Sequence, residues 1–209
     1  GNPVVQDTAA GSYRDVPAAI TYGYGTIAHE VFGEIDEPPT HAIVQAGVGG
    51  VASALCAQFW HGWGAARPRF VVLEPTRAAC VAASLAAGRQ VVVEGDTHTA
   101  MAGLACGTVS DIAWEVLETG ADAALIAPDS LAFEGVRALA RPAGDDPSIV
   151  AGECAGGAVG ALLALAHRPD LRAALDITSA SRVFVLGTEG ATDGAIYEKI
   201  LAGRESELA

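Results

Sequence analysis

Residues 45–52 combine glycine with small apolar side chains in the order Gln-Ala-Gly-Val-Gly-Gly-Val-Ala. This segment lies between a predicted buried strand, residues 41–46, and a predicted helix, residues 51–63. Glycine permits positive φ angles and close backbone approach, and the amide groups that open a helix attract anions. The segment therefore predicts a cradle for a phosphate group. The alternative is a strand-to-helix turn whose glycines serve packing alone.

The same loop also fits a second kind of phosphate ligand. Gly47, Gly49 and Ala52 satisfy the pattern G-x-G-x-x-G/A of dinucleotide-binding proteins. Glu74 follows at the end of the next predicted strand, where a ribose-binding carboxylate would lie. A nicotinamide-dependent dehydrogenase that binds NAD at residues 47–52 is therefore an alternative. A predicted helix precedes the loop, however, whereas a dinucleotide fingerprint normally opens the sheet of its domain.

The elements that must position this loop alternate along the chain. Short apolar runs predict strands over residues 41–46, 70–75, 91–93, 123–127 and 182–187. Helical patterns lie between them, over residues 18–32, 51–63, 76–85, 111–117, 129–140, 158–167 and 193–202. Strands that are apolar on both faces and separated by helices form parallel sheets covered on both sides. We therefore expect an α/β fold of three layers, with a parallel sheet between helices.

Composition excludes several classes of protein. The 209 residues are 51% hydrophobic and 18% charged, which excludes intrinsic disorder. The formal charge of −13 argues against nucleic acid and anionic membranes as partners, because both select basic surfaces. No apolar run reaches membrane-spanning length and no signal peptide is visible, so we expect a cytoplasmic location. The cysteines and histidines show no metal-ligand spacing, so no metal site is predicted.

Six separated segments together resemble one family of enzymes, the diaminopropionate ammonia-lyases. They follow the family order and span nearly the whole chain: Gln-Asp-Thr-Ala at 6–9 with Tyr13 and Pro17, Gln-Ala-Gly-Val-Gly at 45–49, Glu-Pro at 74–75, Met-Ala-Gly-Leu-Ala-Cys-Gly at 101–107, Gly-Glu at 152–153, and Thr-Glu-Gly-x-Thr-Asp at 188–193. The family belongs to the pyridoxal-phosphate enzymes of fold type II, which are similar to the β subunit of tryptophan synthase. The sequence departs from the family pattern at Ala10, at Ser12 and around Cys154.

The resemblance implies roles for particular residues. Gly47, Val48, Gly49 and Gly50 would hold the phosphate of pyridoxal 5'-phosphate. Thr188 would meet the pyridine nitrogen, and a neutral hydroxyl there suits β-elimination. Without the resemblance, Thr188 is equally well explained as a turn or cap hydroxyl.

Three acidic residues are further candidates. Asp7 would face the substrate and assist proton transfer, with an Asx-turn as the structural alternative. Glu153 and Glu74 are weaker candidates for contact with cofactor or substrate. Cys80 and Cys106 fall at family-like positions. We expect them to be two buried thiols, with a disulfide between them as the alternative.

The resemblance also implies a lysine that holds the cofactor as a Schiff base, upstream of residues 6–9. Lys199 is the single lysine of the sequence, and it falls in a predicted terminal helix where lysine normally faces solvent. We therefore expect residues 1–209 to be most of the large pyridoxal-phosphate-binding domain, with the small domain and the Schiff-base lysine in an upstream segment.

The expected activity of the whole enzyme is conversion of 2,3-diaminopropionate to pyruvate and ammonia by α,β-elimination, in a homodimer. This chain alone would be inactive. A non-catalytic homologue of the same fold is the other alternative.

Overall fold

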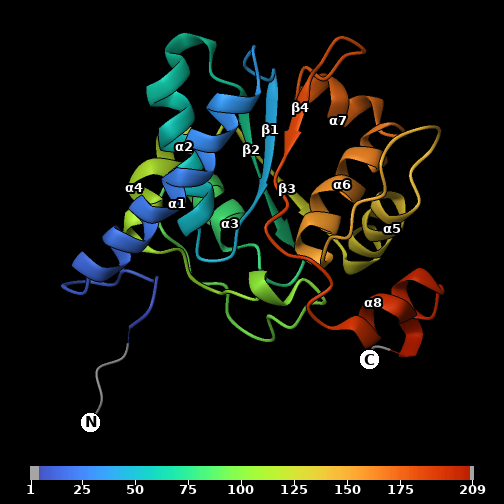
Figure 1. Ribbon diagram of the computed structural model, residues 1–209. Coiled ribbons are helices and arrows are strands. Elements are labelled where there is room, and N and C mark those ends of the chain that lie inside the picture. Colours follow the sequence, from blue (N-terminus) through green and yellow to red (C-terminus); the bar gives the residue numbers. More distant parts are fainter. Residues whose placement is uncertain (1–4, 208–209) are drawn as a thin grey trace.

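The computed structural model describes residues 5–207, and its centre is a sheet of four parallel strands (Figure 1). The strands are β1 (His41–Gln45), β2 (Arg69–Pro75), β3 (Ala123–Ala127) and β4 (Val183–Val185). Their order across the sheet is β3-β2-β1-β4, and β1 pairs with β2 from His41 opposite Arg69 to Gln45 opposite Leu73. Because every pairing is parallel, the carboxyl ends of all four strands meet at one edge.

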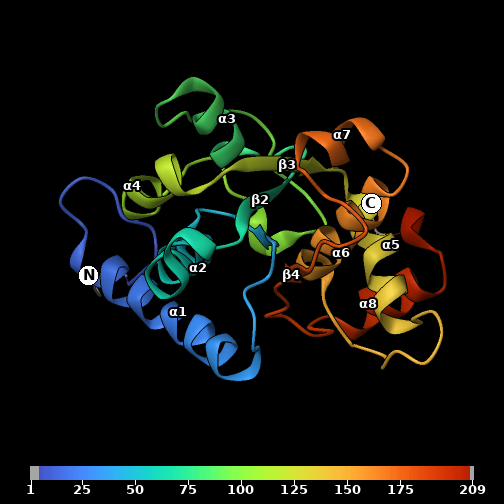
Figure 2. The same cartoon turned by 90° about the horizontal axis from the view of Figure 1, so that it is seen from above.

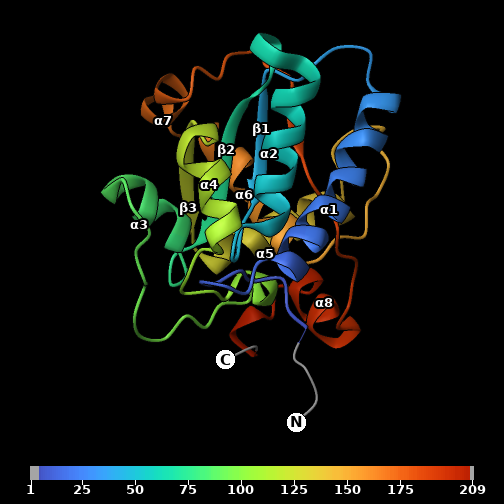
Figure 3. The same cartoon turned by 90° about the vertical axis from the view of Figure 1, so that its left-hand side faces the viewer.

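Helices cover both faces of this sheet (Figure 2). One layer contains α1 (Asp15–Glu34), α2 (Gly50–Trp63), α3 (Cys80–Ala87) and α4 (Asp111–Gly120). The other contains α5 (Asp129–Ala140), α6 (Glu153–Leu165) and α7 (Pro169–Ala174), and α8 (Gly194–Leu201) lies beside α5. Figure 3 views the layer in which α2 lies between α1 and α4. The predicted three-layer α/β architecture is confirmed.

Alternate side chains of the central strands supply two separate cores. Val44 and Val72 pack with α2 and α4 in the first core, which includes Leu55 and Leu117. Ile43, on the opposite face, packs with α6 in the second core. Strand side chains alternate between faces, so the buried strands read as continuous apolar runs. All five residues of β1 are buried.

The prediction of a strand over residues 91–93 is wrong. This segment has β-branched side chains, but it forms no ladder with another strand. The Val93 amide donates to the Gly107 carbonyl and the Val91 amide donates to Ser84 Oγ, while Val92 is exposed. Intrinsic strand preference is therefore insufficient here, because no strand lies alongside to accept the pairing.

Three helices also differ from expectation. Helix α3 begins at Cys80 rather than near Thr76, because residues 76–79 form a turn that lets α3 begin over the Glu74 carboxylate. Helix α7 has six residues, opens with Pro169, and was not predicted. It is too short for its periodicity to be read from sequence. Helix α6 begins at Glu153, five residues before its predicted start at residue 158. The remaining helices and strands lie near their predicted positions.

The described part of the chain contains four free cysteines, so Cys80 and Cys106 are not joined. Within residues 5–207 no group of three or more His, Cys, Asp or Glu side chains is arranged to hold a metal ion. No helix in this range has the length and apolar character required to cross a membrane.

Candidate active site

A cavity of about 610 Å³ opens at the carboxyl edge of the sheet. Six segments line it: the N-terminal segment with Asp7, helix α1 with Tyr24, the loop after β1, the turn that contains Cys106, the start of α6, and the segment after β4 that contains Thr188. The volume falls in the usual range for small-ligand and cofactor sites. In open parallel α/β sheets, ligands bind outside the carboxyl ends of the strands. The cavity is therefore where this fold places a ligand.

The loop after β1 forms one wall of the cavity. Gly49 is the N-cap of α2 and adopts φ of 92°, a left-handed conformation that favours glycine. A Cβ at Gly47 would come within 2.9 Å of the Gly103 carbonyl oxygen, so the close approach also requires glycine there. The first turn of α2 carries no acidic residue that would offset its dipole. Close packing or backbone conformation thus favours glycine at positions 47 and 49, and the N-terminus of α2 lies at the same cavity wall.

Helix α4 supports this wall from behind. The Ser110 amide donates to the Val48 carbonyl at 2.9 Å, and a Cβ at Gly49 would come within 3.0 Å of Ala113. Ser110 Oγ also accepts a hydrogen bond from the Ala9 amide at 2.9 Å. The start of α4 therefore holds both the glycine loop and the segment that carries Asp7. Ser110 is the N-cap residue of α4 but makes no side-chain cap bond, because its oxygen accepts from the Ala9 amide.

Asp7 and Thr188 reach the cavity from opposite ends of the sequence. Asp7 is half-buried, and its Oδ1 accepts a hydrogen bond from Thr8 Oγ1 at 3.3 Å. Thr188 is exposed and follows β4 by three residues. The structure thus brings Asp7, Thr188 and the four residues Gly47, Val48, Gly49 and Gly50 to one cavity.

Glu153 does not line this cavity. It is the first residue of α6 and is half-buried, next to Cys154, which does line it. Burial raises the pKa of Glu153, and the nearby carboxylates of Glu189 and Asp193 raise it further.

The lining residues that were not assigned to the cavity from sequence include Cys106, Cys154 and Glu189. Burial raises the pKa of Cys154 to about 12, and Glu189 beside it adds to the rise. Burial also raises the pKa of the Cys106 thiol. Both thiols therefore stay protonated near neutral pH and are poor nucleophiles. Glu189 belongs to the family-like segment Thr-Glu-Gly-x-Thr-Asp at 188–193, which was the available signal for it.

Glu74 is turned away from the ribose-binding role expected in a dinucleotide site. Its side chain is fully buried, and its two carboxylate oxygens accept hydrogen bonds from the Val81 and Ala82 amides at 2.8 and 2.7 Å. Burial raises its pKa to about 7, against the lowering effect of these amides. Because both carboxylate oxygens bind amides in the first turn of α3, they are not available to a ribose. This removes the main support for an NAD-binding site.

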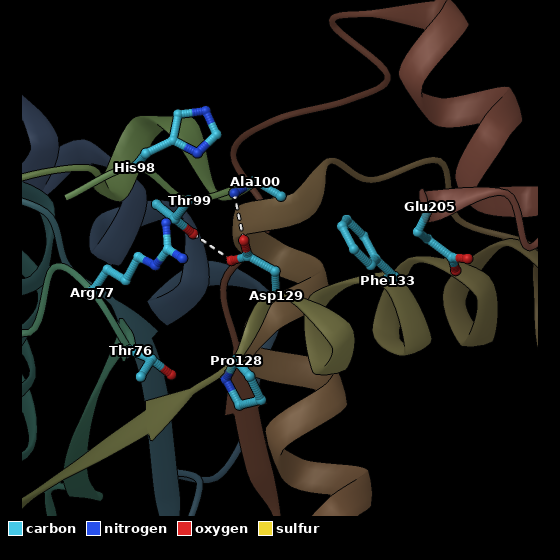
Figure 4. A pocket seen from close by; sticks show the side chains of 9 residues that line it. All are labelled: Thr76, Arg77, His98, Thr99, Ala100, Pro128, Asp129, Phe133 and Glu205. Atoms are coloured by element: carbon cyan, nitrogen blue, oxygen red, sulfur yellow. Dashed lines mark hydrogen bonds between the residues drawn. The ribbon is translucent and has the colours of Figure 1, made fainter. Parts of the chain in front are cut away.

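A second cavity, of about 460 Å³, lies at the carboxyl ends of β2 and β3 (Figure 4). Its charged groups already have partners in the chain. Asp129 accepts hydrogen bonds from Thr99 Oγ1 and from the Ala100 amide, as the dashed lines show. Arg77 pairs with Asp96 at 3.1 Å, and Glu205 pairs with Arg137. This cavity lies where a loop, α5 and the C-terminal turn pack together.

The residues of the first cavity fit pyridoxal phosphate. Backbone amides at the α2 N-terminus suit its phosphate, and the Thr188 hydroxyl suits a ring nitrogen. One buried polar atom there, Gln45 Oε1, has no hydrogen-bond partner among the described residues, as is common where a ligand completes a site.

Fold and cavity together define an α/β domain with a ligand-sized cavity and a helix N-terminus at the carboxyl edge of a parallel sheet. The family described as "Pyridoxal-phosphate dependent enzyme" matches residues 8–188. The chain belongs to this family, and its cofactor is pyridoxal 5'-phosphate.

Within this family, the chain is similar to individual diaminopropionate ammonia-lyases. The chain is 35% identical over 207 residues to diaminopropionate ammonia-lyase of Escherichia coli K12, and 36% identical over 208 residues to that of Salmonella typhimurium. These matches cover 96% and 95% of this chain but 52% of each relative, so the chain spans about half their length. A crystal structure of the Escherichia coli enzyme with an aminoacrylate–PLP azomethine reaction intermediate superposes with a TM-score of 0.88, at 34% identity over 95% of this chain and 52% of that one.

Proposed function

We propose that this chain forms most of the large, cofactor-binding domain of an enzyme that converts 2,3-diaminopropionate to pyruvate and ammonia. One observation carries the proposal: Asp7, the glycine loop and Thr188, which are far apart in sequence, line a single cavity at the carboxyl edge of the sheet. The similarity to two diaminopropionate ammonia-lyases over nearly the whole chain supports the choice of substrate.

When bound, pyridoxal phosphate would supply an electron sink that makes the α-proton of the substrate easier to remove. In our proposal the amides of Gly47, Val48, Gly49 and Gly50 hold the phosphate, aided by the dipole of α2. The Thr188 hydroxyl donates to the ring nitrogen without carrying charge. Asp7 holds a substrate ammonium group or accepts a proton, because a carboxylate is suited to both tasks. Glu153 lies outside the cavity lining, next to Cys154, and contributes negative charge near Glu189.

We further propose that the Schiff-base lysine is not Lys199. Lys199 lies in α8, and its Nζ donates to the Glu207 carbonyl at 3.3 Å. It is not among the residues that line the cavity. Borohydride reduction of the holoenzyme followed by peptide mapping tests this point: the cofactor should be found on another lysine, and label on Lys199 would overturn the assignment.

The experiment for the function as a whole is a titration followed by an assay. The natural protein that carries this chain should bind pyridoxal phosphate and release pyruvate and ammonia from 2,3-diaminopropionate. Binding of the cofactor without turnover of any amino acid would favour a non-catalytic homologue, and absence of binding would reject the proposal.

We also propose a homodimer in a reducing, cytoplasmic compartment. The four free cysteines are consistent with the compartment, and light scattering of the purified protein tests the oligomeric state.

A further inference from the structure

Gln45, the last residue of β1, has a buried side-chain amide, and only one of its two polar atoms has a hydrogen-bond partner among the described residues. It is 7% exposed, and its Nε2 donates to the Leu186 carbonyl oxygen at 3.1 Å. A carbonyl oxygen can only accept a hydrogen bond, so the amide nitrogen must face Leu186. The oxygen is therefore the other end of the amide. Within residues 5–207, Gln45 Oε1 has no hydrogen-bond partner.

The Gln45 side-chain amide lies at the wall of the candidate cofactor cavity. Gln45 lines the cavity and lies two residues before Gly47, at the start of the glycine loop. Leu186 lies two residues before Thr188. The bond from Gln45 to Leu186 thus joins the two segments expected to hold opposite ends of the cofactor.

A buried acceptor without a donor is costly, because it has lost its hydrogen bonds to water and gained none in return. We propose that Gln45 Oε1 accepts a hydrogen bond from an N–H or O–H group of the bound cofactor–substrate pair, while its Nε2 holds Leu186 and so positions Thr188. This inference rests on the function proposed above. The donor is either the ring hydroxyl of the cofactor or an amino group of the substrate.

His41 provides a matched control at the other end of β1. It lies on the same face of the strand as Gln45 and is also buried, at 4% exposed. Its Nε2 lies 2.8 Å from the Leu175 carbonyl oxygen and its Nδ1 lies 2.8 Å from Thr40 Oγ1. Both ring nitrogens are thus engaged, and His41 does not line the cavity.

The test compares Gln45→Met with His41→Leu in the natural protein. The dissociation constant of pyridoxal phosphate is measured on the apoprotein by fluorescence, and the affinity of the loaded protein for 2,3-diaminopropionate is measured by the absorbance of the cofactor. We expect Gln45→Met to weaken one of the two affinities about tenfold, the effect of a lost hydrogen bond. Loss of cofactor affinity would place the donor on the cofactor, and loss of amino-acid affinity alone would place it on the substrate.

Two results would overturn the proposal: both affinities unchanged in Gln45→Met, or an equal loss in His41→Leu. If Gln45→Met does not fold, a measurement on the unsubstituted protein still tests the hydrogen bond. The carbon-13 shift of the Gln45 side-chain carbonyl should move when cofactor or substrate is added, and an unmoved signal would reject the hydrogen bond. Failure of the unsubstituted protein to bind cofactor would instead reject the proposed function.

Discussion

The two ends of strand β1 differ in how their buried polar side chains are satisfied. At the amino end, both ring nitrogens of His41 have partners within the protein. At the carboxyl end, the amide nitrogen of Gln45 donates to Leu186, whereas its oxygen has no hydrogen-bond partner among residues 5–207. Both side chains belong to the same strand, lie on the same face and are more than nine-tenths buried. Strand, face and burial therefore cannot explain the difference, which coincides with the cavity.

This contrast separates groups that stabilise the fold from groups that serve a ligand. At the amino end of β1, the polar groups bond to a backbone carbonyl and a hydroxyl of the protein, so they contribute to the stability of the fold. The carboxyl end keeps a glycine loop, an exposed threonine and a free amide oxygen around a cavity. Functional sites commonly retain unsatisfied polar groups that the surrounding fold must support. Substitutions at the two ends should therefore affect different measurements.

The largest effect is expected from Asp7→Asn, which removes the carboxylate but keeps the size of the side chain. Loss of a proton-transferring or ammonium-binding group should lower kcat/KM for 2,3-diaminopropionate about 100-fold or more. Thermal stability should change little, because Asp7 is only half-buried. Asp15→Asn, an exposed change outside the cavity, is the charge-matched control. Equal activity of the two variants would remove Asp7 from the site.

Glu74 should make stability depend on pH. Its pKa is raised in the folded protein from 4.5 to about 7 by burial. A raised pKa contributes stability that is complete below the unfolded value and is lost as the pH rises through the folded value. Between about pH 5 and about pH 8 the loss should be on the order of 2–3 kcal/mol. Urea unfolding at a series of pH values should show this slope, and it should be flatter in Glu74→Gln. An unchanged slope in the variant would contradict the assignment.

Gly47→Ala should weaken the binding of pyridoxal phosphate, because the added methyl group crowds the glycine loop at the carboxyl end of β1. The added Cβ would meet the Gly103 carbonyl oxygen at 2.9 Å and Cys106 Sγ at 3.0 Å. Overpacking of this kind costs about 2 kcal/mol, or ~30-fold in cofactor affinity if the loop moves to relieve it. Gly23→Ala in α1 meets nothing within 4 Å and is the control. Titration with pyridoxal phosphate distinguishes them, and equal affinities would show that the loop adapts without cost.

The smallest effect is expected at the amino end. His41→Leu leaves the buried Leu175 carbonyl without its partner, which should lower the free energy of unfolding by about 1–2 kcal/mol. Cofactor affinity should not change. Denaturant unfolding and a cofactor titration on the same preparation test both statements, and a drop in affinity would break the contrast between the two ends of the strand.

Local patterns predicted the fold well where burial and periodicity agree. The runs at β1 and β2 are apolar on both faces because each strand is covered on both sides. The glycine loop was found because positive φ and close approach leave glycine few substitutes. Residues 91–93 were mispredicted because strand formation needs a neighbouring strand. The start of α3 was misplaced because the Glu74 carboxylate, seven residues before Val81, meets the first turn of that helix.

The sequence by itself determined the parallel α/β class, the glycine loop, and the family resemblance on which the roles of Asp7 and Thr188 rest. Only the tertiary structure decided that Glu74 faces α3 and that Glu153 does not line the cavity. It also decided that Gln45 Oε1 has no hydrogen-bond partner in the described part of the chain. The reason is physical: periodicity and glycine spacing are local properties of the chain. Whether a buried polar atom is satisfied depends on partners far away, such as Leu186, which lies 141 residues from Gln45.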